Sequence, residues 1–96
     1  MYQLRYDPKV GDDLKKLDPP VRSKILKQIE KKLSLAPVEF GKPLRHSLKG
    51  FYRLRVGDYR IIYEIDEKAQ MVTTWMVEKR KDDEVYIEFL KRLKSS

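Results

Sequence analysis

The chain has 96 residues, of which 22 are Lys or Arg and 15 are Asp or Glu, so its formal net charge is +7. This length allows one domain with one modest hydrophobic core. The absence of cysteine excludes disulfides, zinc–thiolate sites and a cysteine nucleophile, and a single histidine excludes a multi-histidine metal site. We expect no cofactor. No apolar run approaches the ~20 residues that span a bilayer, and the N-terminal residues lack the apolar stretch of a signal peptide. We therefore expect a cytoplasmic protein with no membrane partner.

The first elements along the chain predict a strand followed by a helical hairpin. Residues 2–6 alternate apolar and polar side chains, as a short strand does. Asp7-Pro8 is a typical helix start and predicts a helix to about Leu17, and Asp18-Pro19-Pro20 repeats the signal. In the second helix, apolar residues recur every four positions and form one face: Val21, Ile25, Ile29 and Leu33. Residues 36–43, with two prolines and a glycine, predict a loop.

The second half of the chain predicts three strands and a final helix. Residues 51–65 alternate with period two on both sides of Gly57-Asp58, a pair typical of a tight hairpin turn. Residues 71–77 are a mostly apolar strand that we expect to be central, and a last helix is expected from Asp82. The predicted fold is a single α+β domain over 1–96 in the order β-α-α-β-β-β-α. Its small antiparallel sheet carries the helical hairpin on one face.

The positive charge is concentrated in one stretch. Residues 41–60 contain one acidic residue, Asp58, against six basic residues: Lys42, Arg45, Lys49, Arg53, Arg55 and Arg60. This distribution predicts a surface patch rather than an even coat. Such a patch favours a polyanionic partner, either nucleic acid or an acidic protein.

The expected hairpin register places three of these arginines together. With Gly57 and Asp58 as the loop, Arg55 faces Arg60 and Arg53 faces Ile62. Directly opposed residues of an antiparallel pair point to the same side of the sheet. The three arginines therefore share one face, on which Glu64 is the only nearby acidic residue that we expect, and the apolar residues of the hairpin share the other.

Arg55 opposite Arg60 is a repulsive pair that destabilises a sheet unless an anion binds. Phosphate is the matching anion, because the guanidinium fork fits its oxygens and stays protonated. The alternative is a solvent-exposed face on which the long side chains splay apart. A register shift of one residue would also move Arg60 to the core face.

A second basic cluster, Glu78-Lys79-Arg80-Lys81, ends the last strand, and Tyr86 follows in the next helix. We expect Arg80 and Tyr86 to approach the arginine face from the edge of the sheet, where a tyrosine ring stacks on an RNA base. The alternative is that the lysines are exposed turn residues and Tyr86 is half-buried packing. A lone histidine such as His46 is more often incidental than catalytic.

Two segments resemble the RelE/ParE superfamily of toxins from type II toxin–antitoxin systems. They are residues 48–65 (LKGFYRLRVGDYRIIYEI) and 78–86 (EKRKDDEVY), and the second is similar to RelE in particular. The resemblance covers essentially the whole chain. It implies a toxin that enters the ribosomal A site and cleaves mRNA there without a metal ion, by attack of the 2′-hydroxyl on the neighbouring phosphate. It also implies a small acidic RelB-like antitoxin as partner.

The same resemblance implies roles for individual residues. Arg53 and Arg55 occupy positions where RelE has lysines that engage the phosphate and serve in proton removal. Arg60 matches an arginine that stabilises the phosphorane, Arg80 one that assists the leaving 5′-oxygen, and Tyr86 a tyrosine that stacks on the scissile nucleotide. Further RNA contacts are expected from the other basic residues of the two clusters and the histidine: Lys42, Arg45, His46, Lys49, Lys79 and Lys81.

The sequence departs from the RelE pattern at the proton acceptor. Arginine does not lose its proton in proteins, so Arg53 and Arg55 are poor general bases. Candidates for the acceptor, besides ribosomal RNA, are His46, Lys49, Glu64 and Tyr86. Two other functions stay open: inhibition of DNA gyrase in the manner of ParE, without nuclease chemistry, and RNA binding without cleavage.

Overall fold

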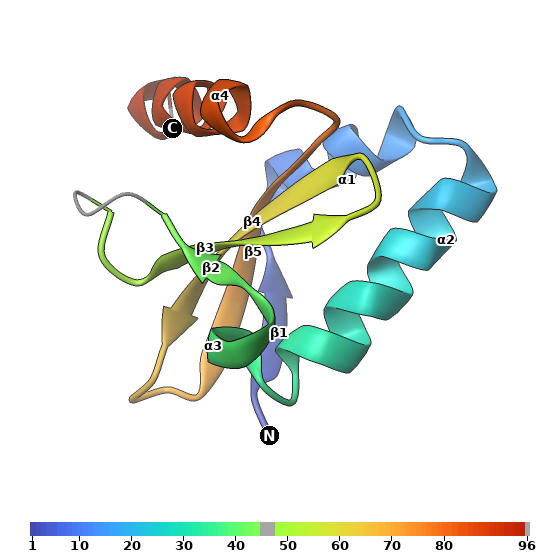
Figure 1. Ribbon diagram of the computed structural model, residues 1–96. Coiled ribbons are helices and arrows are strands. Elements are labelled where there is room, and N and C mark those ends of the chain that lie inside the picture. The colour runs from blue at the N-terminus through green and yellow to red at the C-terminus, as the bar shows by residue number, and fades with distance from the viewer. Residues whose placement is uncertain (45–47, 96) are drawn as a thin grey trace.

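A computed structural model describes residues 1–44 and 48–95 (Figure 1). Its helices and strands follow the chain in this order: β1 (Gln3–Tyr6), α1 (Pro8–Lys15), α2 (Pro19–Gln28), a π-helical turn η1 (Ile29–Leu33), α3 (Pro37–Phe40), β2 (Lys42–Pro43), β3 (Phe51–Val56), β4 (Tyr59–Asp66), β5 (Met71–Glu78) and α4 (Asp82–Ser95). The α+β class and the order of the long elements are confirmed. The loop expected at residues 36–43 instead contains the short elements α3 and β2.

One five-stranded sheet carries the fold, with the strand order β1-β5-β4-β3-β2. Strands β2 to β5 are antiparallel neighbours, as expected, but β1 pairs with β5 in parallel. The expected antiparallel sheet is thus confirmed for these four strands, and β1 adds a parallel strand at one edge. Two helices separate β1 from the remaining strands and allow it to enter the sheet in the same direction as β5. Strand β5 is interior, and β4 is the central strand.

The helical hairpin begins at Asp7, whose carboxylate accepts a hydrogen bond from the Lys9 amide at 3.1 Å. Asp18 holds the equivalent position before α2, but its side chain makes no capping hydrogen bond. Pro20 stands at the position from which Lys9 donates to Asp7 in α1, and proline has no amide hydrogen to donate. The helix then continues without a break into η1, so the amphipathic stripe predicted to Leu33 is intact.

The hydrophobic core lies between this helical hairpin and one sheet face. Helix α2 with η1 contributes Ile25, Ile29 and Leu33, and the β3–β4 hairpin contributes Leu54 and Ile61, all at most 2% exposed. This face of the hairpin is the one that the alternating pattern predicts to be buried. The opposite face, which carries the arginines, is thereby turned away from α1 and α2.

A second, smaller core lies on that opposite face, beneath α4. Val85 and Phe89 of α4 pack on Ile62 and Met76. A β-bulge between β4 and β5 pairs Ile62 with Met76 and Tyr63 with Thr74. Trp75 is the extra residue, and it joins Met76 on the α4 side. The C-terminal helix therefore lies across the sheet rather than projecting from it (Figure 1).

A buried ion pair fastens α4 to α1 around the edge of β5. Both oxygens of the Asp13 carboxylate accept hydrogen bonds from the Arg92 guanidinium at 2.9 Å, and Oδ2 also accepts from the Val77 amide at 2.9 Å. Arg92 donates a further bond to the Trp75 carbonyl at 3.1 Å. Hydrogen bonding to Asp13 raises the pKa of Arg92. The pair occupies the part of β5 that the short strand β1 leaves uncovered.

Candidate functional site

The β3–β4 hairpin has the register that the sequence predicts. Arg55 pairs with Arg60, Arg53 with Ile62 and Val56 with Tyr59. Gly57 adopts a φ of 59°, which a glycine tolerates without strain, and Asp58 keeps a negative φ. A positive φ at the first loop position alone is typical of a type II′ turn. The turn therefore holds the register on which the placement of Arg60 depends.

Four basic residues lie on three neighbouring strands, β2, β3 and β4, near this turn. Strand β2 adds Lys42 directly opposite Arg53, beside the Arg55–Arg60 pair. Lys42 and Arg55 are exposed, whereas Arg53 and Arg60 are half-buried. Opposed residues point to the same side, so these four residues share one face of the sheet. We call Lys42, Arg53, Arg55 and Arg60 the basic row.

The basic row ends against a carboxylate that the hairpin pattern does not reveal. Strand β5 places Glu78 directly opposite Arg60, so the expectation that Glu64 is the only nearby acidic residue was wrong. The Arg60 guanidinium donates to the carbonyl oxygens of Tyr59 at 3.3 Å and Gly57 at 3.4 Å, which keeps it close to the turn. Register within a hairpin says nothing about the strand that pairs on its other side.

Glu78 also connects the row to Arg80. The Arg80 Nε atom lies 3.5 Å from Glu78 Oε2, and its Nη1 atom lies 3.9 Å from Glu88 Oε1. The Arg80 side chain is 44% exposed. Ion pairs this exposed contribute at most about 1 kcal/mol, so an arriving phosphate competes with them readily.

Tyr86 lies on the helix that covers the arginine face. Its neighbour Val85 is buried on the sheet, and Tyr86 itself is half-buried. That this tyrosine reaches the arginines stays a prediction. Helix α4 lies on the face itself, because Ile62 between the arginines is apolar and needs a cover.

A groove of about 180 Å³ opens along β3 beside β2. It is lined by Lys32, Phe40, Lys42, Arg53, Leu54 and Arg55. Phe40 is 49% exposed, and Lys32 Nζ lies 5.5 Å from the centroid of its ring. Lys32 and Phe40 were missed by the sequence reasoning because they lie in η1 and α3, remote in sequence from the arginines.

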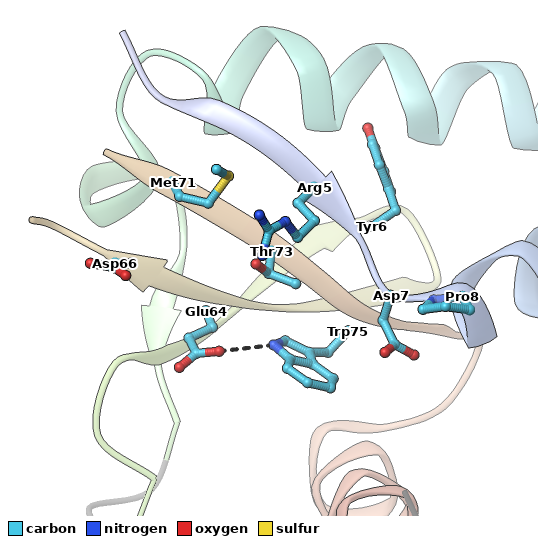
Figure 2. A pocket seen from close by; sticks show the side chains of 9 residues that line it. All are labelled: Arg5, Tyr6, Asp7, Pro8, Glu64, Asp66, Met71, Thr73 and Trp75. Carbon is cyan, nitrogen blue, oxygen red and sulfur yellow. Dashed lines mark hydrogen bonds between the residues drawn. The ribbon is translucent and has the colours of Figure 1, made fainter. Parts of the chain in front are cut away.

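An acidic hollow of about 330 Å³ lies among β1, β4 and β5 (Figure 2). Its charged residues are three carboxylates, Asp7, Glu64 and Asp66, against one basic side chain, Arg5. Glu64 accepts a hydrogen bond from the Trp75 indole nitrogen at 3.1 Å, drawn as a dashed line in Figure 2. Glu64 lies on the face of the basic row, two residues beyond Ile62 along β4. Because it carries excess negative charge, the hollow repels a polyanion and bounds the basic surface on this side.

The remaining sequence candidates are dispersed. Lys49 is exposed just before β3, at the opposite end of that strand from the turn. Lys79 lines a different hollow, on the α1 side of the sheet, and Lys81 is exposed before α4. Arg45 and His46 lie outside the described residues. The structure thus joins Lys42 to the three arginines and keeps Lys49 and Lys79 apart from them.

Within residues 1–44 and 48–95, no three side chains of the types that ligate metals gather into a candidate ion site. Among the helices in this part of the chain, none combines the length and the apolar character that crossing a membrane requires.

Comparison with known proteins identifies a family and curated relatives to which the chain is similar. Residues 4–84 match the family described as the ParE toxin of the type II toxin–antitoxin system parDE. The chain is 35% identical over 81 residues to Toxin RelG of Mycobacterium tuberculosis (strain ATCC 25618 / H37Rv), a match that covers 84% of this chain and 93% of RelG.

Two solved structures show the same similarity in the backbone. One is the toxin–antitoxin complex RelBE2 from Mycobacterium tuberculosis, with a TM-score of 0.76 and 34% identity over 82% of this chain and 98% of the matched chain. The other is the isolated E. coli RelE toxin, with a TM-score of 0.70 and 27% identity over 97% and 99% of the two chains. Both matches include most of the chain.

Proposed function

Because the chain belongs to the RelE/ParE superfamily of type II toxins, we propose that it acts as a ribosome-dependent mRNA endonuclease. The observation that carries the proposal is the basic row, in which Arg53, Arg55 and Arg60 share one sheet face in the predicted register. A fold gains no stability from placing Arg55 opposite Arg60, whereas a phosphate between them relieves the repulsion.

The basic row supplies the electrostatic part of the reaction. Arg53, Arg55 and Lys42 hold the scissile phosphate, and Arg60 stabilises the negative charge that develops as the 2′-oxygen bonds to phosphorus. The bond from phosphorus to the 5′-oxygen then breaks, leaving a cyclic phosphate and a 5′-hydroxyl end. Preorganised donors of this kind are worth roughly 10²–10³ in rate each. The 2′-hydroxyl gives its proton to an acceptor other than the three arginines, which stay protonated, and the departing 5′-oxygen takes up a proton to become the hydroxyl.

Arg80 and Tyr86 complete the site from the α4 side. Arg80 leaves its exposed ion pairs with Glu78 and Glu88 and assists the departing 5′-oxygen. Tyr86 stacks on the nucleotide beside the cleaved bond. This stacking holds the 2′-hydroxyl in line with the phosphate, and such positioning lowers the barrier by itself.

End mapping of mRNA tests the proposal directly. The protein is incubated with ribosomes programmed with a defined message and, in parallel, with the same message alone. We expect new 5′-hydroxyl ends within the A-site codon only in the presence of ribosomes. Intact message in both reactions at micromolar protein would contradict the proposal.

Gyrase inhibition is the second candidate, because the matching family model is that of ParE toxins. A DNA supercoiling assay separates the two functions. The nuclease leaves gyrase active, whereas a ParE-like inhibitor blocks supercoiling and leaves the message intact on the ribosome.

We further propose that a small acidic antitoxin neutralises the toxin by covering the basic row or displacing α4. The solved relative from Mycobacterium tuberculosis is a toxin–antitoxin complex, which supports such a partner. The net charge of +7 favours an acidic one.

A further inference from the structure

We infer that the groove along β3 binds single-stranded RNA next to the scissile phosphate, with Phe40 as a base-stacking residue and Lys32 as a phosphate contact. The inference rests on the proposed function in taking RNA as the ligand, and it assigns two residues from η1 and α3 to the binding of that RNA. The groove shares Lys42, Arg53 and Arg55 with the basic row. An RNA strand that places one phosphate on the row therefore enters the groove with its neighbouring nucleotide.

Phe40 is held in place by a buried contact behind it. The hydroxyl of Tyr63, which is fully buried, donates a hydrogen bond to the Pro37 carbonyl at 2.5 Å and fixes the start of α3. Gly41 then passes so close to β3 that a Cβ there would lie 1.9 Å from the Tyr63 hydroxyl and 2.8 Å from the Arg53 carbonyl. The backbone on both sides of Phe40 is thus fixed, although the residue is 49% exposed.

The chemistry of the lining selects the ligand. The residues that line the groove bring four cations and one exposed aromatic ring, and no carboxylate is among them. Cations beside an exposed ring are the features with which proteins bind single-stranded nucleic acid without reading its sequence. The carboxylates of an acidic peptide would satisfy the cations but do not stack on the aromatic ring, whereas each nucleotide offers both a phosphate and a base. The observations therefore favour RNA over an acidic protein segment.

Direct binding measurements test the groove. The probe is a fluorescein-labelled single-stranded RNA of about twelve nucleotides, titrated at several salt concentrations. We expect Phe40→Leu to weaken binding at least about fivefold with an unchanged salt slope, and Phe40→Trp to restore it, because stacking needs an aromatic ring. We expect Lys32→Gln to reduce the log–log salt slope by about 0.7, the value for one phosphate of a single strand.

Two matched variants serve as controls. Lys31→Gln makes the same charge change on the neighbouring residue, and Val38→Ala truncates another exposed side chain of α3. Neither residue lines the groove. Both variants should bind RNA with the affinity and salt slope of the unmodified protein.

The possible results separate this inference from the proposed function. If Phe40→Leu and Lys32→Gln bind RNA like the controls while the unmodified protein cleaves mRNA on ribosomes, the groove inference is overturned and the nuclease stands. If both variants lose RNA affinity but the unmodified protein never cleaves, the groove inference holds and the nuclease fails. A loss of affinity for polyglutamate with unchanged RNA binding would assign the groove to an acidic protein and overturn the inference.

Discussion

The Asp13–Arg92 pair offers a quantitative test of how α4 is held on the sheet. In Asp13→Ala, the Arg92 guanidinium and the Val77 amide lose their common acceptor. Asp13 is 5% exposed and the Arg92 side chain 16%, so water replaces the lost carboxylate poorly. Removing one partner of a buried pair costs about 3–5 kcal/mol, because it leaves an uncompensated charge.

This cost is a large part of the free energy of unfolding of a typical domain, which is about 5–15 kcal/mol. The loss of stability is measured by urea unfolding, followed by circular dichroism. The dependence of the free energy of unfolding on urea concentration should stay that of the unmodified protein. Arg92→Met should lose a similar amount. The double variant Asp13→Leu/Arg92→Met should recover only part of the loss, since an apolar pair replaces the buried ion pair at little cost but leaves the Val77 amide without its acceptor.

Hydrogen exchange adds a local readout. The amides of α4 should lose protection in Asp13→Ala more than those of α2, because Arg92 hydrogen-bonds α4 to Asp13 of α1 and to the Trp75 carbonyl of β5. If Asp13→Ala loses less than about 1 kcal/mol of the free energy of unfolding, the value of an exposed ion pair, then Asp13 and Arg92 do not form a buried ion pair that holds α4.

Three further predictions concern single residues. Burial raises the pKa of Tyr63, so its contribution to stability is complete below the ordinary tyrosine pKa near 10 and is lost as pH rises above it. Urea titrations should show a steeper alkaline loss, by up to about 1.4 kcal/mol per pH unit, in the unmodified protein than in Tyr63→Phe. Gly57→Ala should cost about 1–2 kcal/mol because φ is 59°, whereas Gly11→Ala inside α1 should add about 0.5–1 kcal/mol, with no atom in the way of either Cβ. Equal effects of the two substitutions on urea unfolding would contradict this reasoning. Arg80→Gln should change stability by less than about 1 kcal/mol yet slow mRNA cleavage at least about tenfold, and a variant that cleaves at the unmodified rate would remove Arg80 from the site.

Local patterns were sufficient for the hairpin that carries the basic row. The loop pair Gly57-Asp58 fixes which residues oppose one another, and the alternation on both sides fixes which face is buried. The helical stripe ending at Leu33 is equally local, and it identified the helices that cover the core face. These predictions needed only neighbours in the sequence, and the structure confirms them.

The remaining features depend on contacts between distant residues. The parallel pairing of β1 with β5 and the Asp13–Arg92 pair cannot be predicted from the local pattern of apolar and polar residues. The bulge at Trp75 interrupts the alternation of β5, and without its register Glu78 could not be placed opposite Arg60. The burial of Ile62 among arginines was the one available sign that a helix covers this face. Lys32 and Phe40 reach the site only through the tertiary fold.

The most direct test of the basic row as a catalytic surface is the rate of A-site mRNA cleavage by Arg60→Ala, compared with Arg22→Ala in α2. Both variants remove one arginine, but only Arg60 belongs to the basic row. We predict that Arg60→Ala cleaves roughly 10²–10³ times more slowly than the unmodified protein and that Arg22→Ala cleaves at the same rate as the unmodified protein. Equal rates for the two variants, with both shown to be folded, would contradict the claim that the basic row stabilises the transition state.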